Sequence, residues 1–180
     1  MFASAEPPIL GIDPGLTRCG YAVVRRTSGP GRPPGAQAVA MGVLRTPAGE
    51  VLAARLAQIQ VDIEALLDEF SPSAVAVEQV FFQNNVRTAM SVAQASGVVL
   101  AAAARRGCHV VQYTPSQVKS TIAGWGGADK TQVQKMVQMR LGLATLPTPA
   151  DAADAAALAL CHLAMAPSLA VARRTGGDLS

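Results

Sequence analysis

The chain alternates short apolar runs with longer segments whose apolar residues recur at helical spacing. The short runs are bounded by turn residues and predict five strands, at 8–13, 20–24, 37–44, 74–78 and 109–112. The helical spacing predicts five helices. The first begins at Thr46-Pro47 and ends near Phe70, the second covers 86–106, and the third begins at Pro115. The fourth covers 129–141, and the fifth begins near Thr148-Pro149. The order of these elements implies an α/β domain with a mixed five-stranded sheet flanked by helices.

The sequence shows no internal repeat and no domain boundary. We therefore expect a single domain with a core from about 8 to 166 and flexible tails at 1–7 and 167–180. The segment Ser28–Gly35 is rich in glycine and proline and is expected to form a mobile loop. In the helix over 86–106, one face of small residues would let another backbone approach closely, either in the core or across a dimer: Ala89, Ala93, Gly97 and Ala101.

Composition excludes several classes of protein. Half of the residues are hydrophobic and 15% are charged, which is typical of a packed chain rather than a disordered one. The longest apolar run, Ala155–Ala166, is too short to span a membrane, and Met1–Pro8 lacks the pattern of a signal peptide. The three cysteines are far apart in the sequence, so they predict reduced thiols in a cytoplasmic protein rather than a disulfide or zinc framework.

The positions of the acidic residues indicate a metal site. Asp13 and Glu78 end two of the predicted strands, after apolar stretches where a lone charge is unfavourable. Asp151 and Asp154 lie three residues apart in an otherwise apolar helix, so they share one face of it. Taken singly, each acid has a structural alternative: Asp13 suits a turn, and Asp151 suits the first turn of a helix. Together, on three elements of one small domain, the four favour metal binding.

A cluster of four carboxylates needs a compensating charge. Two carboxylates about 5 Å apart repel each other by roughly 3 kcal/mol at an effective dielectric constant near 20, and a bound cation removes that cost. Oxygen ligands select Mg²⁺ or Mn²⁺ over Zn²⁺, and two such ions can hold the attacking and leaving oxygens of a phosphodiester. If these acids hold metal, the rest of the chain is more basic than the net charge of +3 suggests, which favours a nucleic acid as partner.

Five short motifs stand out between about Pro8 and Leu163. They are Leu10-Gly-Ile-Asp13-Pro-Gly15 with Gly20-Tyr21, Val77-Glu78-Gln-Val-Phe81, Pro115-Ser-Gln-Val-Lys119, Ala128-Asp-Lys130-Thr-Gln-Val133, and Ala150-Asp-Ala-Ala-Asp154-Ala. In this order they resemble the motifs of the RuvC family of Holliday junction resolvases, which are crossover junction endodeoxyribonucleases. The first motif alone also occurs in actin-like ATPases, so the resemblance depends on all five in register.

The resemblance implies a ribonuclease-H-like fold and a homodimer that makes paired symmetric nicks in four-way junctions, leaving 5′-phosphates. It also implies that the branch-migration proteins RuvA and RuvB are partners, in recombination and repair. Two Mg²⁺ ions are expected in each subunit, with Mn²⁺ as a substitute. The residues that would bind them are the four acids already singled out, Asp13, Glu78, Asp151 and Asp154.

The resemblance assigns further residues to the DNA. Lys119 and Lys130 are expected near the scissile phosphate, where they would offset the charge on its oxygens. An aromatic side chain stacks on junction bases in the family, and Phe81 or Phe82 takes this role here. Contacts to the DNA backbone or bases are also expected from residues around this pair: Gln79, Asn84, Asn85 and Arg87.

Two more residues favour structural roles. His162 lies on the same helical arc as the aspartates but about two turns further on, so we expect it to be packed or hydrogen-bonded rather than a metal ligand. Trp125 lies among glycines and is expected to anchor a loop.

Two other functions compete with the nuclease. A non-catalytic module would bind a four-way junction without nicking it, although the retention of all four acids argues against this. An actin-like ATPase is suggested by Gly11-Ile-Asp-Pro-Gly15, but such proteins need a second phosphate loop and a second domain, for which 180 residues are too few. A cleavage assay and an ATP-binding assay separate the three possibilities.

Overall fold

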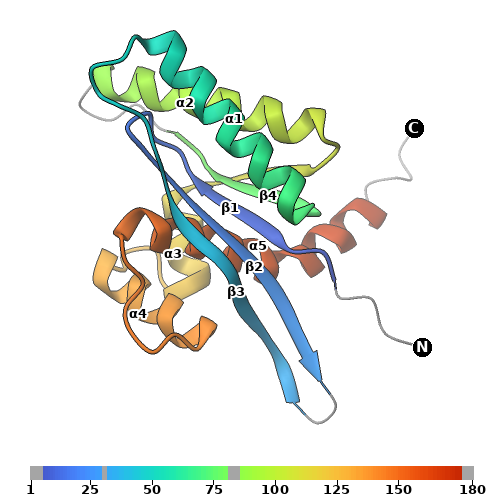
Figure 1. Cartoon of the computed structure of the whole chain (residues 1–180). Coiled ribbons are helices and arrows are strands. Elements are labelled where there is room, and N and C mark those ends of the chain that lie inside the picture. Colours follow the sequence, from blue (N-terminus) through green and yellow to red (C-terminus); the bar gives the residue numbers. More distant parts are fainter. Residues whose placement is uncertain (1–5, 30–31, 81–85, 176–180) are drawn as a thin grey trace.

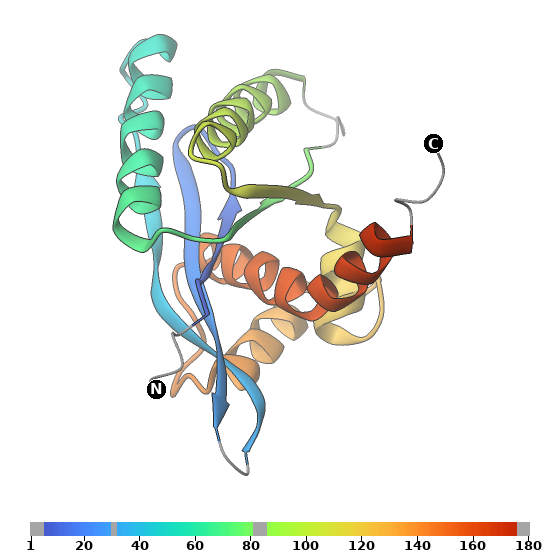
Figure 2. The ribbon, with the colours of Figure 1, turned by 90° about the vertical axis from the view of Figure 1, so that its right-hand side faces the viewer.

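The computed structural model describes residues 6–29, 32–80 and 86–175, and in this part of the chain a single sheet lies between two layers of helices (Figure 1, Figure 2). The elements follow in the predicted order, so the α/β architecture is confirmed. They are β1 Ile9–Asp13, β2 Arg18–Gly29, β3 Arg32–Arg45, α1 Leu52–Phe70, β4 Ala74–Glu78, α2 Val86–Arg105, β5 His109–Tyr113, α3 Pro115–Ala123, α4 Lys130–Leu141 and α5 Ala150–Thr175.

The sheet is mixed, as predicted. Its strands lie in the order β3-β2-β1-β4-β5. β1 pairs antiparallel with β2, and β2 antiparallel with β3, which gives the expected meander. β1 pairs parallel with β4, and β4 parallel with β5. The carboxyl ends of these three parallel strands therefore meet at one edge of the sheet, where ligands of α/β sheets commonly bind.

The two faces of the sheet have different neighbours because successive side chains of a strand point to opposite sides. Figure 2 shows α1 and α2 over one face, and α3, α4 and α5 over the other. The core beneath α1 and α2 includes the large residues of the central strands, Leu10, Ile12, Val75 and Val77. The core beneath α5 includes their small neighbours, Ala22, Ala74 and Ala76, together with the alanines of α5.

Helix α5 lies against the sheet at a separation that only glycine permits. A β-carbon on Gly11 of β1 would lie 2.0 Å from the carbonyl oxygen of Ala155, and one on Gly20 of β2 would lie 2.1 Å from that of Asp151. Both values are far below van der Waals contact, so a side chain at either position would push the helix away. Because Gly20 pairs with Asp13 in the sheet, this contact places the start of α5 beside the end of β1.

The β2–β3 hairpin is longer than the sequence predicts, and it projects past the helices in Figure 1. A loop is predicted at Ser28–Gly35, whereas Gly29 pairs with Arg32 and most of this segment belongs to β2 or β3. The prediction is wrong here because β3 is an edge strand. The missing N–H groups of its two consecutive prolines are tolerated because β3 is an edge strand and because the register with β2 shifts between Thr27 and Gly29, which leaves both prolines unpaired.

Two helix boundaries also differ from the prediction. α1 begins at Leu52 rather than at Thr46-Pro47, because Thr46 is still tied to the chain before β2. Its hydroxyl donates to the carbonyl oxygen of Leu16 at 2.5 Å, and its N–H donates to that of Thr17 at 3.3 Å. At the other end, α5 continues to Thr175 although a frayed tail is predicted after Pro167. The residues that follow this proline are mostly alanine, leucine and arginine, which favour helix.

Two expectations from composition can be compared with the described residues. No helix among them is long and apolar enough to cross a membrane. The three cysteines are free thiols, as predicted: Cys19 and Cys161 are buried, and Cys108 is partly buried.

Candidate active site

Asp13 and Glu78 end adjacent parallel strands and point to the same face of the sheet. Ile12 pairs with Val77 across β1 and β4, so an acid follows directly in each strand. The face that the two acids share is the face of Gly11, which contacts α5. The structure thus brings together the two strand-end carboxylates that the sequence singled out.

A cavity of about 420 Å³ opens between this edge of the sheet and the helices α3, α4 and α5. Asp13, Glu78 and Asp154 line it, and so do Lys119 and Lys130. Apolar residues of the same helices complete its wall. Three of the four predicted acids and both predicted lysines, carried by five different elements, therefore share one space.

Asp151 lies one helical turn before Asp154 but is not among the described residues that line the cavity. Its Oδ2 accepts hydrogen bonds from Arg18 Nε at 3.0 Å and from Arg18 Nη2 at 2.6 Å. These bonds hold the pKa of Asp151 below its usual range. Arg18 has no local signal in the sequence that marks it as part of the site, because its partner lies 133 positions away. Asp151 therefore stands at the border of the cluster and is held there by an arginine.

Burial and mutual repulsion raise the pKa values of the two strand-end acids. The pKa of Asp13 rises to about 8, first because burial disfavours the charged carboxylate and then because Glu78, Asp154 and Asp151 are negative neighbours. The pKa of Glu78 rises as well, through burial and then through Asp154. Such shifts are common at functional sites, where like charges are held together out of water.

Two short helices with capped N-termini hold the lysines at the cavity. The side chains of Thr114 and Asp129 each form a capping box, at the starts of α3 and α4. Lys130 is the first residue of α4, and its Nζ lies 2.8 Å from Asp154 Oδ2. The hydrogen bond to Asp154 raises the pKa of Lys130, so the ammonium remains charged. Lys119 reaches the same cavity from α3.

No three histidine, cysteine, aspartate or glutamate side chains of the described residues stand in a ready-made metal-binding arrangement. The contacts show the reason, since Asp151 is turned to Arg18 and Asp154 is turned to Lys130. The donor set is nevertheless made of carboxylate oxygens, which are the ligands that hard divalent cations prefer. These residues fit a divalent cation if Asp151 leaves Arg18 and Asp154 leaves Lys130, so that both aspartates can bind the cation instead.

Several predicted DNA contacts lie outside the described residues: Phe81, Phe82, Asn84 and Asn85. Arg87 belongs to the first turn of α2, and its side chain also lies outside the described part. Gln79 directly follows Glu78 and is exposed, while its N–H donates to the carbonyl oxygen of Tyr113 at 2.8 Å.

Structural roles are predicted for His162 and Trp125, and the structure places the two side chains differently. His162 is buried, and its Nδ1 lies 2.8 Å from the hydroxyl oxygen of Tyr113, which ends β5. Its predicted role as a packed and hydrogen-bonded histidine is confirmed. Trp125 is 55% exposed, so it does not anchor the loop to the core. The indole rests on the backbone of Gly127 rather than in the core.

Comparison with known sequences points to one family. The family model described as Crossover junction endodeoxyribonuclease RuvC matches residues 9–162. A relative of that name from Parafrankia sp. is 54% identical over 90% of this chain and 89% of its own length. Another, from Saccharopolyspora erythraea, is 55% identical over 88% of this chain and 78% of its own length.

Solved structures agree with this result. Thermus thermophilus RuvC matches with a TM-score of 0.82 at 38% identity, over 89% of this chain and 96% of that one. The T. thermophilus RuvC structure in complex with a Holliday junction substrate gives a TM-score of 0.83 at 37% identity, over 91% and 96%. The yeast mitochondrial Holliday junction resolvase, at 13% identity and a TM-score of 0.67, shares the fold. The ribonuclease-H-like fold is therefore confirmed, and the chain belongs to the RuvC family of crossover junction endodeoxyribonucleases.

Proposed function

We propose that this chain cuts four-way DNA junctions with divalent metal ions, and that the cavity lined by Asp13, Glu78 and Asp154 is its catalytic centre. The family defines the class of reaction, since its members are crossover junction endodeoxyribonucleases. One observation carries the assignment to this cavity: three carboxylates and two lysines from five elements meet there. That combination suits a phosphodiester held between metal ions and positive side chains.

We assign metal binding to the three acids of the cavity and to Asp151. The raised pKa of Asp13 supports this, because a bound cation would relieve the repulsion that contributes to it. Asp151 would join by leaving Arg18, and the side chains of that ion pair are 30% and 37% exposed. Ion pairs with such access to water are worth about 0–1 kcal/mol, so the exchange costs little. Two Mg²⁺ ions per subunit, with Mn²⁺ as a substitute, follow from the family resemblance.

The bound cations would supply Lewis acidity and charge neutralisation at the phosphodiester. The lysines supply the protein's own positive charge. Lys119 and Lys130 line the cavity and offset the negative charge that develops on the phosphate oxygens as water displaces the 3′-oxygen and the strand is cut to leave a 5′-phosphate. Lys130 contacts Asp154 in the structure. Transfer of Asp154 to a cation would free the ammonium of Lys130 for the phosphate.

The contacts to the junction are proposed on the family resemblance. Phe81 or Phe82 would stack on a junction base close to Glu78, because only a few residues separate them in the sequence. Gln79 is exposed at the same end of β4 and suits a contact to DNA. The polar residues that follow the phenylalanines would bind the DNA backbone or bases: Asn84, Asn85 and Arg87.

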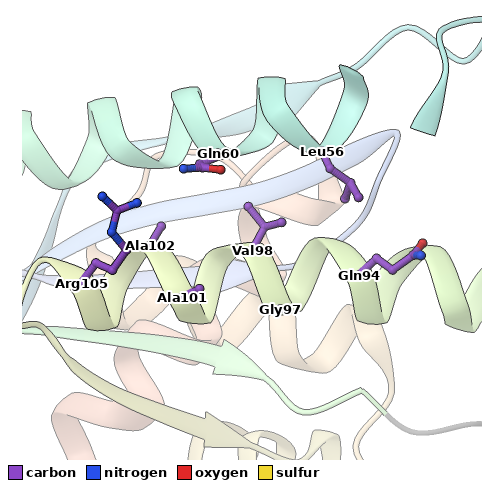
Figure 3. A pocket seen from close by; sticks show the side chains of 8 residues that line it. All are labelled: Leu56, Gln60, Gln94, Gly97, Val98, Ala101, Ala102 and Arg105. Carbon is purple, nitrogen blue, oxygen red and sulfur yellow. The ribbon is translucent and has the colours of Figure 1, made fainter. Parts of the chain in front are cut away.

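We also propose that the active form is a homodimer and that α2 contributes to its interface. A groove of about 410 Å³ lies between α1 and α2. Leu56 and Gln60 line it on one side, and Gly97, Val98 and Ala101 line it on the other (Figure 3). Two of the small residues predicted to allow close approach are thus at the surface instead of in the core. We assign this groove to a second copy of the chain, because paired symmetric nicks require two active sites.

Sedimentation of the full chain tests the dimer. Replacing Ala101 by arginine places a long charged side chain in the groove and should shift the protein from dimer to monomer. A wild-type protein that sediments as a monomer at all concentrations would contradict this part of the proposal. RuvA and RuvB remain proposed partners through the family resemblance.

Cleavage of an end-labelled four-way junction, mapped at nucleotide resolution, tests the catalytic proposal. We expect paired symmetric nicks in the presence of Mg²⁺, no nicks in EDTA, and no cutting of a linear duplex of the same sequence. Binding of the junction without nicking in Mg²⁺ would support the non-catalytic module instead. ATP should leave the melting temperature unchanged, which would dispose of the ATPase alternative.

A further inference from the structure

The loop between α3 and α4 carries an exposed tryptophan. Trp125 is the single tryptophan of the chain and is 55% exposed. The other aromatic side chains of the described residues, Tyr21, Phe70 and Tyr113, are buried or partly buried. An exposed indole does not contribute to stability the large free energy that its burial would provide, so its exposure indicates a function other than packing.

The loop is firmly held although its tryptophan is exposed. It begins at Gly124, which adopts φ +89 and donates its N–H to the carbonyl oxygen of Ser120 at 3.0 Å. Arg140 of α4 donates to the last carbonyl oxygens of α3, at 3.0 and 3.1 Å. Within the loop, the N–H of Ala128 donates to the carbonyl oxygen of Trp125 at 3.4 Å. The indole is therefore presented on an ordered turn.

The ring itself is supported on one side. A β-carbon on Gly127 would lie 2.2 Å from Cζ3 of Trp125, so the six-membered ring rests where a side chain at 127 would otherwise be. An aromatic side chain that is already supported loses little conformational entropy when a ligand covers it. The arrangement suits a flat partner that can stack on the exposed part of the ring.

The loop flanks the catalytic cavity. It leads directly into Lys130, which contacts Asp154. Its Gly126 packs on α3, since a β-carbon there would lie 2.9 Å from Ser116 Oγ. Ser120 Oγ lies 3.2 Å from the same point, so the loop packs on the side of α3 that carries Ser116 and Ser120, about 60–100° around the helix from Lys119. The indole thus belongs to the loop that joins the two helices that carry both cavity lysines.

We propose that Trp125 is an additional DNA contact, which stacks on an unpaired base of the junction while the phosphate backbone occupies the cavity. This inference rests on the proposed function of that cavity. An aromatic ring beside positive side chains is the combination that binds single-stranded nucleic acid, because bases stack on the ring and phosphates bind the cations. An apolar protein partner would not make use of the neighbouring lysines. The contact is distinct from the one proposed for Phe81 or Phe82.

The emission of Trp125 reports on the contact directly, because no other tryptophan contributes. A four-way junction is titrated into the full-length protein in EDTA, where no strand is cut. Stacking predicts that the emission is quenched at saturation and that acrylamide quenches the remaining emission less than in the free protein. A linear duplex without unpaired bases should produce a smaller change.

Affinity measurements on variants supply the second readout. Trp125→Ala should weaken junction binding about 5- to 150-fold, the loss expected for one base–aromatic stack, whereas Trp125→Phe should keep most of the affinity. Met139→Ala is the matched control, since Met139 lies on α4 with 72% of its surface exposed. Because stacking releases no counterions, Trp125→Ala should leave the slope of log K against log salt unchanged, while Lys119→Ala should reduce it by about 0.9.

The outcomes separate this inference from the proposed function. Unchanged emission at saturating junction, or a Trp125→Ala variant that binds as tightly as wild type, would overturn the stacking role while wild-type cleavage still supports the nuclease. A wild-type protein that neither binds nor cuts the junction would overturn both. A reduced salt slope in Trp125→Ala would also overturn stacking, because it would show that the loop acts through phosphate contacts.

Discussion

The two faces of the sheet use the same strands in opposite ways. Toward α5, β1 presents Ile9, Gly11 and then an acid, and β4 presents two alanines and then an acid. The helix lies so close to Gly11 and Gly20 that neither position has room for a β-carbon. Toward α1 and α2, the same strands present large side chains that are fully buried: Leu10, Ile12, Val75 and Val77. The α1–α2 face is filled by large side chains, whereas the α5 face is filled by the close approach of the helix backbone.

This difference explains why the candidate site forms on the α5 face of the sheet. Close approach of α5 is what allows Asp154 to share a cavity with Asp13 and Glu78. The acids stand at the ends of the strands, where the apolar packing stops and the cavity begins. The α1–α2 face should therefore tolerate conservative changes, while the α5 face depends on the absence of side-chain atoms and on the presence of charge.

The largest expected effect is on catalysis by the α5 face. Asp13→Asn or Glu78→Gln should lower the rate of junction cutting by at least about 10²–10³-fold, the loss that follows removal of one group that stabilises the transition state. Junction binding should persist or tighten, because the repulsion between the site and phosphate falls. Asp62→Asn on α1, whose Oδ1 accepts a hydrogen bond from Gln58, is the control and should cut normally. Parallel loss of binding and cutting would contradict the assignment.

The next effect tests the close approach of α5. Gly11→Ala should lower the free energy of unfolding by about 3 kcal/mol, the upper part of the range for overpacking, because the new carbon would overlap the backbone of Ala155. Ile12→Val removes one methylene from the opposite face and should cost about 0.5–1.5 kcal/mol. Urea unfolding of the two variants measures both values, and equal losses would remove the distinction between the faces.

A third change tests the hydrogen bond that ties β5 to α5. Tyr113→Phe leaves Nδ1 of the buried His162 without its partner, which should cost about 1–3 kcal/mol of unfolding free energy. The matched control is Tyr21→Phe, because Tyr21 packs at the edge of the opposite core. That variant should stay within about 0.5 kcal/mol of wild type. A control that loses as much as Tyr113→Phe would show that the hydroxyl bond is not responsible.

The smallest effect is a dependence of stability on pH. Burial, and then the positive charge of His109, hold the pKa of His162 below 6.5. The unfolded chain thus takes up a proton near pH 6.5 while folded His162 does not. The contribution of this histidine to stability is complete above that pH and is lost as the pH falls toward the folded pKa, by at most about 1.4 kcal/mol per pH unit.

Thermal unfolding of wild type and His162→Gln between pH 5 and 8 measures this dependence. The variant should lack the fall in stability below pH 6.5 that His162 causes, while the opposite dependence of Asp13, whose pKa is raised to about 8, is common to both proteins and cancels in the difference between them. An unchanged profile in the variant would show that His162 does not set the dependence.

Much of the fold could be predicted because the relevant signals are local. Alternation and helical spacing identify each element, and the order of elements implies the α/β class. The missed boundaries have non-local causes. β2 extends to Gly29 and β3 begins at Arg32 because the two strands pair with each other, and α1 starts late because Thr46 is bonded to Leu16. Neither contact is visible within a window of neighbouring residues.

The candidate site divides in the same way. The acids and lysines could be named from motifs, because each motif is a short run whose residue types suit metal or phosphate. The contact of Asp151 with Arg18 and the exposure of Trp125 could not, since they depend on how distant segments pack. The sequence around Trp125 would be the same whether its ring faced the core or the solvent.

By itself, the sequence determined the kinds of elements, their order, and which side chains can bind metal or phosphate. Those properties belong to single residues and to their nearest neighbours along the chain. The tertiary structure decided which of these side chains meet, which are neutralised by a basic partner, and which aromatic ring stays in water. Such properties arise from the distance between α5 and the sheet and from the positions of α3 and α4, which many residues set together.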